Sequence, residues 1–250
     1  MTGANRFDGK TALITGASKR LGRETALALA RSGSNLVIHY NSSEASALDL
    51  AEELRAMGVE ATAVRADLRN PEASQEMFQK VWMDLGGVDY LVNNASIFPA
   101  GRLDEIDFRE VQRNLQVNAW APFLLIRSFW RQIRGTRRRG SVVNLLDTRL
   151  VGGDLAHAAY HLSKSALGEI TTLTALEFAP ELRVNGVAPG AVLPPEDKDE
   201  DYLKGLTAEL PLRERGYPRD IAEATLYLLE ATFVTGQGIF VDGGRHIRMG

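Results

Sequence analysis

Near its N-terminus the chain reads Thr11-Ala12-Leu13-Ile14-Thr15-Gly16-Ala17-Ser18-Lys19-Arg20-Leu21-Gly22, an apolar run followed by a glycine-containing turn. Gly16 permits a tight turn after a strand, and Gly22 allows the helix that follows to pack closely. The free N–H groups at the start of such a helix attract phosphate. The alternative is a plain strand-to-helix turn. The strand-like segments further along the chain favour the phosphate-binding interpretation.

Short apolar, β-branched runs alternate with amphipathic helical stretches along the rest of the chain. After residues 11–15 they occupy residues 35–40, 61–65, 88–93, 141–146, 183–187 and 238–241. Nearly continuous apolar strands that alternate with helices are typical of a parallel sheet covered on both faces. No Pro/Gly-rich linker, repeat or low-complexity segment divides the sequence. We therefore predict a single α/β domain over residues 1–250, a Rossmann-type doubly wound parallel sheet of seven strands with helices on both faces.

Composition narrows the classes of partner. Hydrophobic residues make up 44% of the 250 residues, enough for a sizeable core, and the formal net charge is −3. That charge gives no reason to expect nucleic acid or an anionic membrane, so small molecules or copies of the chain are the expected partners. The absence of cysteine excludes disulfides and cysteine-ligated zinc, and we predict no metal site. No apolar run resembles a signal peptide or approaches a membrane span of roughly 20 residues, so we expect a soluble cytoplasmic protein.

One segment interrupts the alternation of strands and helices. Residues 191–210 follow the sixth predicted strand and contain an acidic run that begins with two prolines at 194–195. Ligands of open α/β sheets bind at the carboxyl edge, which this segment overhangs. We predict a mobile substrate loop here, with a solvated acidic loop as the alternative.

Tyr160 and Lys164 have the spacing of two residues that share one face of a helix. An ammonium group near a phenol favours phenolate, so we expect the lysine to lower the tyrosine pKa from its usual value of about 10. The pair follows Asp147, which comes at the end of the fifth predicted strand. Together with the glycine turn, this arrangement resembles the short-chain dehydrogenase/reductase family. The resemblance implies that Tyr160 is the proton donor and that Lys164 also binds the nicotinamide ribose.

Asp147 departs from the usual pattern of that family, in which a serine at this place hydrogen-bonds a substrate carbonyl. An ionised aspartate only accepts hydrogen bonds and repels a developing oxyanion, so it suits a substrate that is rich in N–H donors. The aspartate resembles the pteridine reductase branch, as do Ser96 in place of a glycine and Phe98 two residues later. The resemblance implies that Phe98 stacks on a flat pterin ring. An ordinary core phenylalanine is the alternative.

The predicted cofactor is NADPH. NAD-dependent enzymes usually carry an acid at the end of the second strand, where this chain has none before Glu44. Lys19 and Arg20 add positive charge, which a 2′-phosphate requires, and Arg20 occupies the place of the middle glycine in the family's usual turn. A solvated helix start is the alternative for these two residues. The expected cofactor contacts in this part of the chain are Gly16, Lys19, Arg20, Leu21, Gly22, His39, Tyr40, Asn41, Ser42 and Ser43.

The resemblance assigns further cofactor contacts at the ends of the third and fourth strands. Asp67 and Leu68 correspond to an adenine contact, with a helix cap as the alternative for Asp67. Asn94, Ala95 and Ser96 correspond to the strand end that lines the adenosine and nicotinamide-ribose pocket. We therefore expect all five residues to border the cofactor.

Other assignments concern the nicotinamide end. Pro189 and Gly190 correspond to the turn beside the nicotinamide carboxamide. Asn118 corresponds to an asparagine that holds a water of a proton relay behind the lysine, with local backbone bonding as the alternative. We interpret Arg149 as a loop ion-pair partner outside the site. His157 is interpreted either as a residue at the substrate mouth or as a solvated helix residue.

These assignments predict an NADPH-dependent pteridine reductase that reduces a dihydropterin to its tetrahydro form by hydride transfer. The expected substrate contacts are Arg20, Ser96, Phe98, Asp147 and Tyr160. Dihydromonapterin, dihydrobiopterin and dihydrofolate remain open, and residues 242–248 resemble the C-terminus of bacterial dihydromonapterin reductases. One alternative is a carbonyl reductase of the same family that acts on a 3-oxoacyl carrier protein or a sugar. The other is a catalytically idle nucleotide-binding scaffold.

Two long helical stretches, residues 120–134 and 158–176, carry apolar residues around much of their circumference. Such helices require more cover than one face of a sheet supplies. The family resemblance implies that the equivalent helices pair across a two-fold axis. We therefore expect a homotetramer.

Overall fold

The computed structural model describes residues 6–194 and 200–249, which contain one seven-stranded sheet in the order β3-β2-β1-β4-β5-β6-β7. Every neighbouring pair of strands is parallel. The strands are β1 (Thr11–Ile14), β2 (Asn35–Tyr40), β3 (Ala61–Arg65), β4 (Tyr90–Asn93), β5 (Gly140–Leu145), β6 (Leu182–Pro189) and β7 (Gly238–Val241). This arrangement confirms the predicted doubly wound fold.

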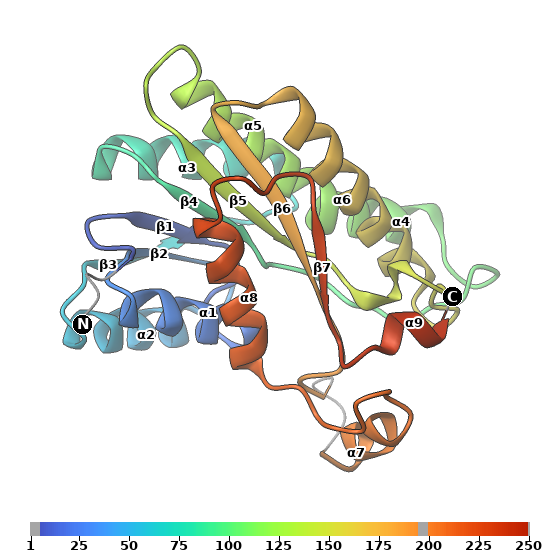
Figure 1. Ribbon diagram of the computed structural model, residues 1–250. Coiled ribbons are helices and arrows are strands. Elements are labelled where there is room, and N and C mark those ends of the chain that lie inside the picture. Colours follow the sequence, from blue (N-terminus) through green and yellow to red (C-terminus); the bar gives the residue numbers. More distant parts are fainter. Residues whose placement is uncertain (1–5, 195–199, 250) are drawn as a thin grey trace.

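Helices cover both faces of the sheet (Figure 1). One face carries α1 (Arg20–Arg31), α2 (Glu44–Ala56) and α8 (Pro218–Glu230). The other carries α3 (Pro71–Leu85), α4 (Phe108–Leu115), η1 (Gln116–Trp120), α5 (Ala121–Ile133) and α6 (Ala158–Glu177). The remaining helices are η2 (Thr148–Leu150), α7 (Glu200–Ala208) and α9 (Arg245–Met249). Within the described ranges, no helix has both the length and the apolarity needed to cross a membrane.

The core consists of two layers, one on each side of the sheet. Ile14 and Ile38 point into the layer of α1, α2 and α8, whereas their neighbours Leu13 and Val37 point into the layer of α3 and α5. This follows from the two-residue period of a strand. Burial of each such side chain contributes about 1.5–3 kcal/mol, which keeps the strand ends in fixed positions.

The segment predicted as a loop at residues 191–210 is in part helical. Helix α7 occupies Glu200–Ala208, and its Leu203 is buried. Acidic residues at its start suit a helix N-terminus. The expectation of a continuous loop is therefore wrong for this helix. Residues 195–199 lie outside the described residues, and the mobility of the segment stays a prediction.

The buried His39 side chain holds the glycine turn through a hydrogen bond. The Gly16 N–H donates to Nδ1 of His39 (3.1 Å), and Nε2 lies 3.1 Å from the Ala66 carbonyl oxygen. Since Nδ1 accepts a hydrogen bond, the ring proton is on Nε2, which donates to that carbonyl. Burial lowers the pKa of His39 to about 4, although the Ala66 carbonyl and Asp67 act in the opposite sense. A neutral imidazole thus connects the ends of β1, β2 and β3.

We predict that acid destabilises the fold through His39. In the unfolded chain a histidine titrates near 6.5, whereas the folded state holds His39 neutral down to a pKa of about 4. Its contribution is complete above pH 6.5 and is lost as the pH falls towards 4. The loss reaches about 3 kcal/mol at the lower end of that window. Urea unfolding at several pH values across this window measures it.

His39→Gln is the matched control, because an amide offers an acceptor and a donor but does not titrate. We expect its free energy of unfolding to fall less steeply with acid than that of the unmodified protein. Equal slopes in the two proteins would contradict the role given to His39.

Candidate active site

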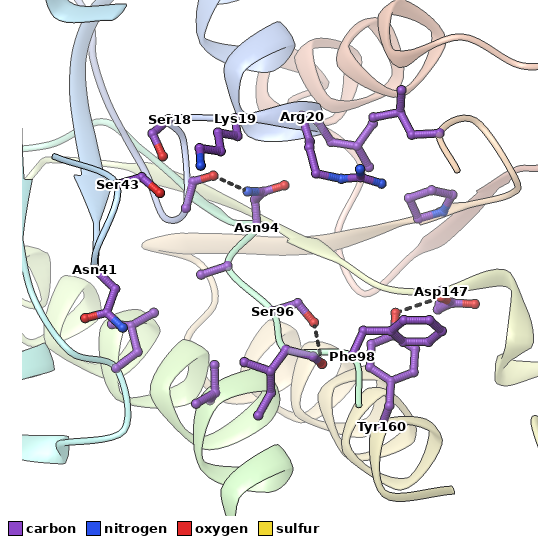
Figure 2. Close-up of a pocket in the computed structure, with 18 of the residues that line it drawn as sticks. Ser18, Lys19, Arg20, Asn41, Ser43, Asn94, Ser96, Phe98, Asp147 and Tyr160 are labelled. Atoms are coloured by element: carbon purple, nitrogen blue, oxygen red, sulfur yellow. Dashed lines mark hydrogen bonds between the residues drawn. The ribbon is translucent and has the colours of Figure 1, made fainter. Parts of the chain in front are cut away.

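A cavity of about 580 Å³ opens at the carboxyl ends of the strands, where the strand order reverses between β1 and β4 (Figure 2). Most of the predicted site residues line it. They are Gly16, Lys19, Arg20, Leu21, His39, Tyr40, Asn41, Ser42, Ser43, Asp67, Leu68, Asn94, Ala95, Ser96, Phe98, Asp147, Tyr160, Pro189 and Gly190. Gly22, Asn118 and Lys164 are not among the lining residues and lie behind this wall.

The glycine turn packs closely against the residues that follow β4, so its two glycines have no space for a Cβ. Gly16 has φ +62°, and a Cβ at this residue would lie 2.9 Å from the Cα of Ala95. A Cβ on Gly22 would lie 2.5 Å from the Gly16 carbonyl oxygen. Gly22 thus allows close packing, as expected, but the structure does not place it on the cavity wall. Arg20, at the place of the family's glycine, has φ +54°, a conformation that costs a non-glycine residue about 1–2 kcal/mol.

The two cations of the turn point in different directions (Figure 2). Arg20 donates through Nη2 to the Pro194 carbonyl oxygen at 2.7 Å, so it reaches the segment that follows β6. Lys19 lies on the side of Ser43 and Asn41. Of the two cations of the turn, Lys19 is therefore the one on the side of the residues that follow β2. Arg20 points instead towards Pro194.

Asn94 holds the turn rather than pointing its amide into the cavity. Its Nδ2 donates to the carbonyl oxygens of Thr15 (2.8 Å) and Gly16 (2.9 Å). The Thr15 hydroxyl in turn accepts from the N–H groups of Asn94 (2.9 Å) and Ala95 (3.0 Å). These bonds fasten β1 to the end of β4. The N–H groups of Asn94 and Ala95 and the Asn94 amide nitrogen therefore all have partners within the protein.

Asp67 forms a bidentate ion pair with Arg69 at the end of the cavity where adenine is predicted to bind. The Arg69 Nη2 lies 2.6 Å from Asp67 Oδ2, and the Arg69 hydrogen bonds lower the pKa of the carboxyl despite partial burial. Helix α3 is capped by Asn70, whose side chain accepts from the N–H groups of Glu72 and Ala73. The helix-cap alternative for Asp67 is therefore wrong. An adenine contact stays a prediction.

At the end of β2, the first carboxylate is already engaged. The Tyr40 hydroxyl donates to Oε1 of Glu44 at 2.9 Å. Asn41, Ser42 and Ser43 form the cavity wall between them and offer only neutral polar groups. This wall has no acid that would repel a 2′-phosphate.

Tyr160 donates a hydrogen bond of 2.7 Å to Oδ2 of Asp147. Burial, and then the Asp147 carboxylate, raise the pKa of Tyr160 well above its usual value, and Arg149 opposes the shift only in part. The expectation that Lys164 lowers this pKa is wrong. Lys164 turns away to donate to the Leu145 carbonyl oxygen (2.6 Å), and its Nζ lies 5.7 Å from the centre of the phenol ring.

Lys164 shares the expected helix face with Tyr160 but is buried against β5. Burial lowers its pKa to about 8, and the Asp147 carboxylate opposes part of that shift. Its side chain lies outside the cavity wall, so its predicted contact with a ribose is not shown by this arrangement.

Asp147 is fixed by the short helix that it begins. Its Oδ1 accepts from the Arg149 N–H at 2.7 Å, and it caps η2. The neighbouring Thr148 donates its hydroxyl to Oδ2 of Asp242, just after β7, at 2.5 Å. The Asp147 carboxylate therefore has Oδ1 in the helix cap and Oδ2 in the hydrogen bond with Tyr160.

Phe98 lies at the cavity and is 37% exposed, so the core-phenylalanine alternative is wrong. Its ring meets the Tyr160 ring edge to face, with centres 4.6 Å apart. His157 stacks on it with ring centres 3.9 Å apart and an angle of 16°. His157 is thus a support for Phe98 and not a solvated helix residue.

Asn118 connects three elements through its amide. It lies in the π-helical turn η1, a distortion that is frequent at functional sites. Its Oδ1 accepts from the Ile97 N–H (2.8 Å) and the Ser96 hydroxyl (3.1 Å), and its Nδ2 donates to the Ser163 hydroxyl (2.9 Å). These bonds cross between elements, so the alternative of purely local bonding is wrong. The predicted water relay is untested.

Several lining residues were not predicted from the sequence. Arg149, interpreted as lying outside the site, is on the cavity wall. Its position two residues after Asp147 was the available signal. Arg69, Arg113 and Arg245 also line the cavity and were not predicted. Leu193, Leu203 and Leu206 line it too, and they belong to the segment 191–210 that was expected over this edge of the sheet.

The geometry fits a dinucleotide. Gly16 and Gly22 have no space for side chains, the first residues of α1 line the cavity, and Lys19 supplies positive charge. The wall then continues from Asp67 at one end to Tyr160 at the other. A long ligand with phosphates in its middle is the shape that this wall accommodates.

Comparison with known proteins agrees with this geometry. A family profile described as "Enoyl-(Acyl carrier protein) reductase" matches residues 16–246. The chain is 30% identical to the L-rhamnose 1-dehydrogenase (NAD(P)(+)) of Sphingomonas sp. (strain SKA58), over 97% of this chain and 98% of that protein. It is 33% identical to the 3-oxoacyl-[acyl-carrier-protein] reductase FabG of Staphylococcus epidermidis, over 95% of this chain and 99% of that protein.

A similar solved structure is that of the FolM alternative dihydrofolate reductase 1 from Brucella canis, complexed with NADP. The TM-score is 0.88 at 30% sequence identity, and the match covers 96% of this chain and 95% of that one. Because the profile spans most of the sequence and these relatives match almost all of it, the chain belongs to the short-chain dehydrogenase/reductase family of oxidoreductases.

Proposed function

We propose that this protein is an NADPH-dependent pteridine reductase, which reduces a dihydropterin to the tetrahydropterin. The observation that carries the proposal is the hydrogen bond of 2.7 Å between Tyr160 and Asp147, on a cavity wall that also presents Phe98. A carboxylate and an aromatic ring side by side suit a flat heterocycle with N–H groups at its edge. The similar structure from Brucella canis, an alternative dihydrofolate reductase, agrees with a pterin-type substrate.

Asp147 favours a pterin over a carbonyl compound because it cannot donate a hydrogen bond when ionised. A ketone oxygen that gains negative charge would be repelled by it. The amino group and ring N–H of a pterin are donors, and a carboxylate beside the proton donor accepts them. The Phe98 ring can stack on the same heterocycle, which is worth about 0.5–1.5 kcal/mol beyond burial.

Tyr160 supplies the proton of the reaction. Its raised pKa keeps the phenol protonated at neutral pH, so it acts as an acid and not as a phenolate. NADPH, when bound, supplies a hydride to the carbon of a ring C=N bond. Tyr160 provides the proton for the adjacent nitrogen, either directly or through Asp147 or a water. Lys19, Ser42 and Ser43 are the residues that we assign to the 2′-phosphate.

A carbonyl reductase is the second candidate. The relatives named as 3-oxoacyl-[acyl-carrier-protein] reductase and L-rhamnose 1-dehydrogenase favour it. A panel that compares NADPH oxidation with dihydropterins, dihydrofolate, 3-oxoacyl thioesters and sugars tests both candidates. Turnover of any of them also excludes an idle scaffold.

We predict that Asp147→Ser lowers kcat/KM for the dihydropterin by about 10²-fold or more, the usual size of a general acid–base contribution. The serine keeps a short polar side chain but removes the negative acceptor. Steady-state NADPH oxidation measures the effect, and fluorescence titration with NADPH checks that cofactor binding survives. Unchanged pterin turnover, or a dominant carbonyl activity that the serine improves, would overturn the proposed function. Tyr160→Phe should abolish either activity and serves as the inactive reference.

The cofactor assignment predicts that kcat/KM favours NADPH over NADH by at least about tenfold, or roughly 1.4 kcal/mol. Lys19→Ala should shrink this ratio because it removes the cation of the glycine turn that lies on the side of Ser43. Arg20→Ala should change the ratio less, since its guanidinium is engaged with Pro194. Equal use of both cofactors by the unmodified protein would refute the assignment.

We also propose a homotetramer, because helix α6 presents apolar side chains to solvent in the single chain. These are Leu162, Leu173 and Leu176. Light scattering at micromolar concentration should give about four times the chain mass of 27.4 kDa. Leu173→Glu, which places a charge on this face, should shift the mass towards smaller species. A monomer mass for the unmodified protein would contradict the proposal.

A further inference from the structure

Arg149 lies between two carboxylates at the substrate end of the cavity. Its Nε is 3.1 Å from Oδ2 of Asp154, and its Nη1 is 3.8 Å from Oδ2 of Asp147. The latter oxygen is the one that accepts the Tyr160 hydroxyl. The Arg149 side chain is only 18% exposed, so these contacts are poorly screened by solvent.

Asp154 is a fixed anchor for this guanidinium. Its Oδ1 accepts from the N–H groups of Ala156 (2.9 Å) and His157 (3.2 Å), and its Oδ2 is 3.0 Å from Nδ1 of His157. Burial alone would raise the pKa of Asp154, but the Arg149 cation and these hydrogen bonds outweigh it and hold the pKa below its usual value. Asp154 is therefore an anion whose position is set by the backbone.

Arg149 and His157, both partners of Asp154, contact the Phe98 ring. The Arg149 guanidinium carbon lies 5.0 Å from the centre of the Phe98 ring, a cation–π distance. His157, whose imidazole is bonded to Asp154, stacks on that ring at 3.9 Å. The ring plane of Phe98 thus depends on the Arg149–Asp154 pair in two ways. Arg149 contacts the ring directly, and Asp154 holds the imidazole that stacks on it.

We propose that Arg149, anchored by Asp154, is a positioning residue that sets the places of Asp147 and Phe98 for the substrate ring. The inference rests on the proposed function, because these two side chains are the assigned pterin contacts. Without the cation, Asp147 and Asp154 would repel each other across the space that the guanidinium now fills. The carboxylate would lose its fixed distance to Tyr160, and Phe98 would lose its support.

A purely structural ion pair is the rival explanation. It predicts a loss of stability with no specific effect on substrate. A positioning role predicts a loss that is confined to the substrate, with the cofactor site unaffected, because the glycine turn and Lys19 lie outside these contacts. Substitutions of Arg149 separate the two.

The first experiment compares Arg149→Met, which keeps length but removes charge, with Arg149→Lys, which restores the charge. Arg149→Met should lower kcat/KM for the dihydropterin by about 10- to 100-fold, the range expected for a small misplacement of reacting groups. The Kd for NADPH, from fluorescence titration, should change less than about twofold, within the usual context dependence of a distant site. Arg149→Lys should recover most of the loss.

Arg6→Met is the matched control, since Arg6 forms an ion pair with Glu230 far from the cavity. It should leave all kinetic constants unchanged. The midpoint of urea unfolding is measured for every variant, so that a general loss of stability is recognised. If Arg149→Met is destabilised, it is assayed under conditions in which the protein remains folded, or Asp154→Asn is used in its place.

The second variant is Asp154→Asn, which removes the anchor's charge and keeps its shape. Its effect should have the same direction as that of Arg149→Met. The double variant should be little worse than the worse single one, because both changes break the same pair. Multiplied losses in the double variant would show independent roles and overturn the inference.

The failures are distinguishable. If the unmodified protein reduces dihydropterins and Arg149→Met does so equally well, only the positioning role is refuted. If Arg149→Met and Arg149→Lys lose the same activity, charge is not what Arg149 contributes, and the inference again fails. If the unmodified protein reduces a carbonyl compound and no pterin, the proposed function fails and the positioning role falls with it.

Discussion

The hydrogen bond from Tyr160 to Asp147 is the contact on which the chemistry of the cavity depends. A buried phenol beside a carboxylate retains its proton, because phenolate would be both poorly solvated and repelled. The carboxylate in turn presents acceptors where most members of the family present a hydroxyl donor. In the proposed reaction, the carboxylate of this pair accepts N–H donors of the substrate and the phenol supplies the proton. The surrounding structure serves to keep the pair at 2.7 Å.

That distance depends on strands that are far apart in the sequence. Asp147 follows β5, Tyr160 lies on α6, and Thr148 is tied to Asp242 beyond β7. A parallel sheet brings the carboxyl ends of such strands to one edge, where side chains from distant segments meet. Hydrophobic layers on both faces hold the strands, so Asp147 and Tyr160 lie on a rigid base. The fold and the site are therefore consequences of the same strand register.

The sequence predicted the fold well because its signals are local and repeated. Each strand is an apolar run with its own turn, and the glycine turn at Gly16 marks the edge where ligands bind. The motifs also identified residues most of which line one cavity in the structure. The errors concern tertiary contacts. Spacing places Lys164 on the face of Tyr160, but it cannot show that a long side chain turns towards β5 and leaves the phenol to Asp147.

Arg149 was not placed in the predicted site, and the contacts of Asn118 were not predicted, for a similar reason. Their partners come from other elements, and nothing in their neighbouring residues records the pairing. Arg149 looks like a loop cation until Asp154 and Phe98 are seen around it. Asn118 looks like a mid-helix asparagine until its bonds to Ile97 and to Ser163 on α6 are known. The burial of a polar group is a property of the folded chain and not of the residue.

Arg20 has a consequence for how the two ends of the cavity communicate. A glycine at this position would relax the backbone, but it would have no side chain to reach Pro194. The arginine has an unfavourable backbone conformation, and its side chain joins the glycine turn to Pro194 in the segment after β6. A ligand group that binds this guanidinium in place of the Pro194 carbonyl would break that hydrogen bond. Because such linkage is reciprocal, holding Pro194 in place would weaken the binding of that ligand group by the same factor.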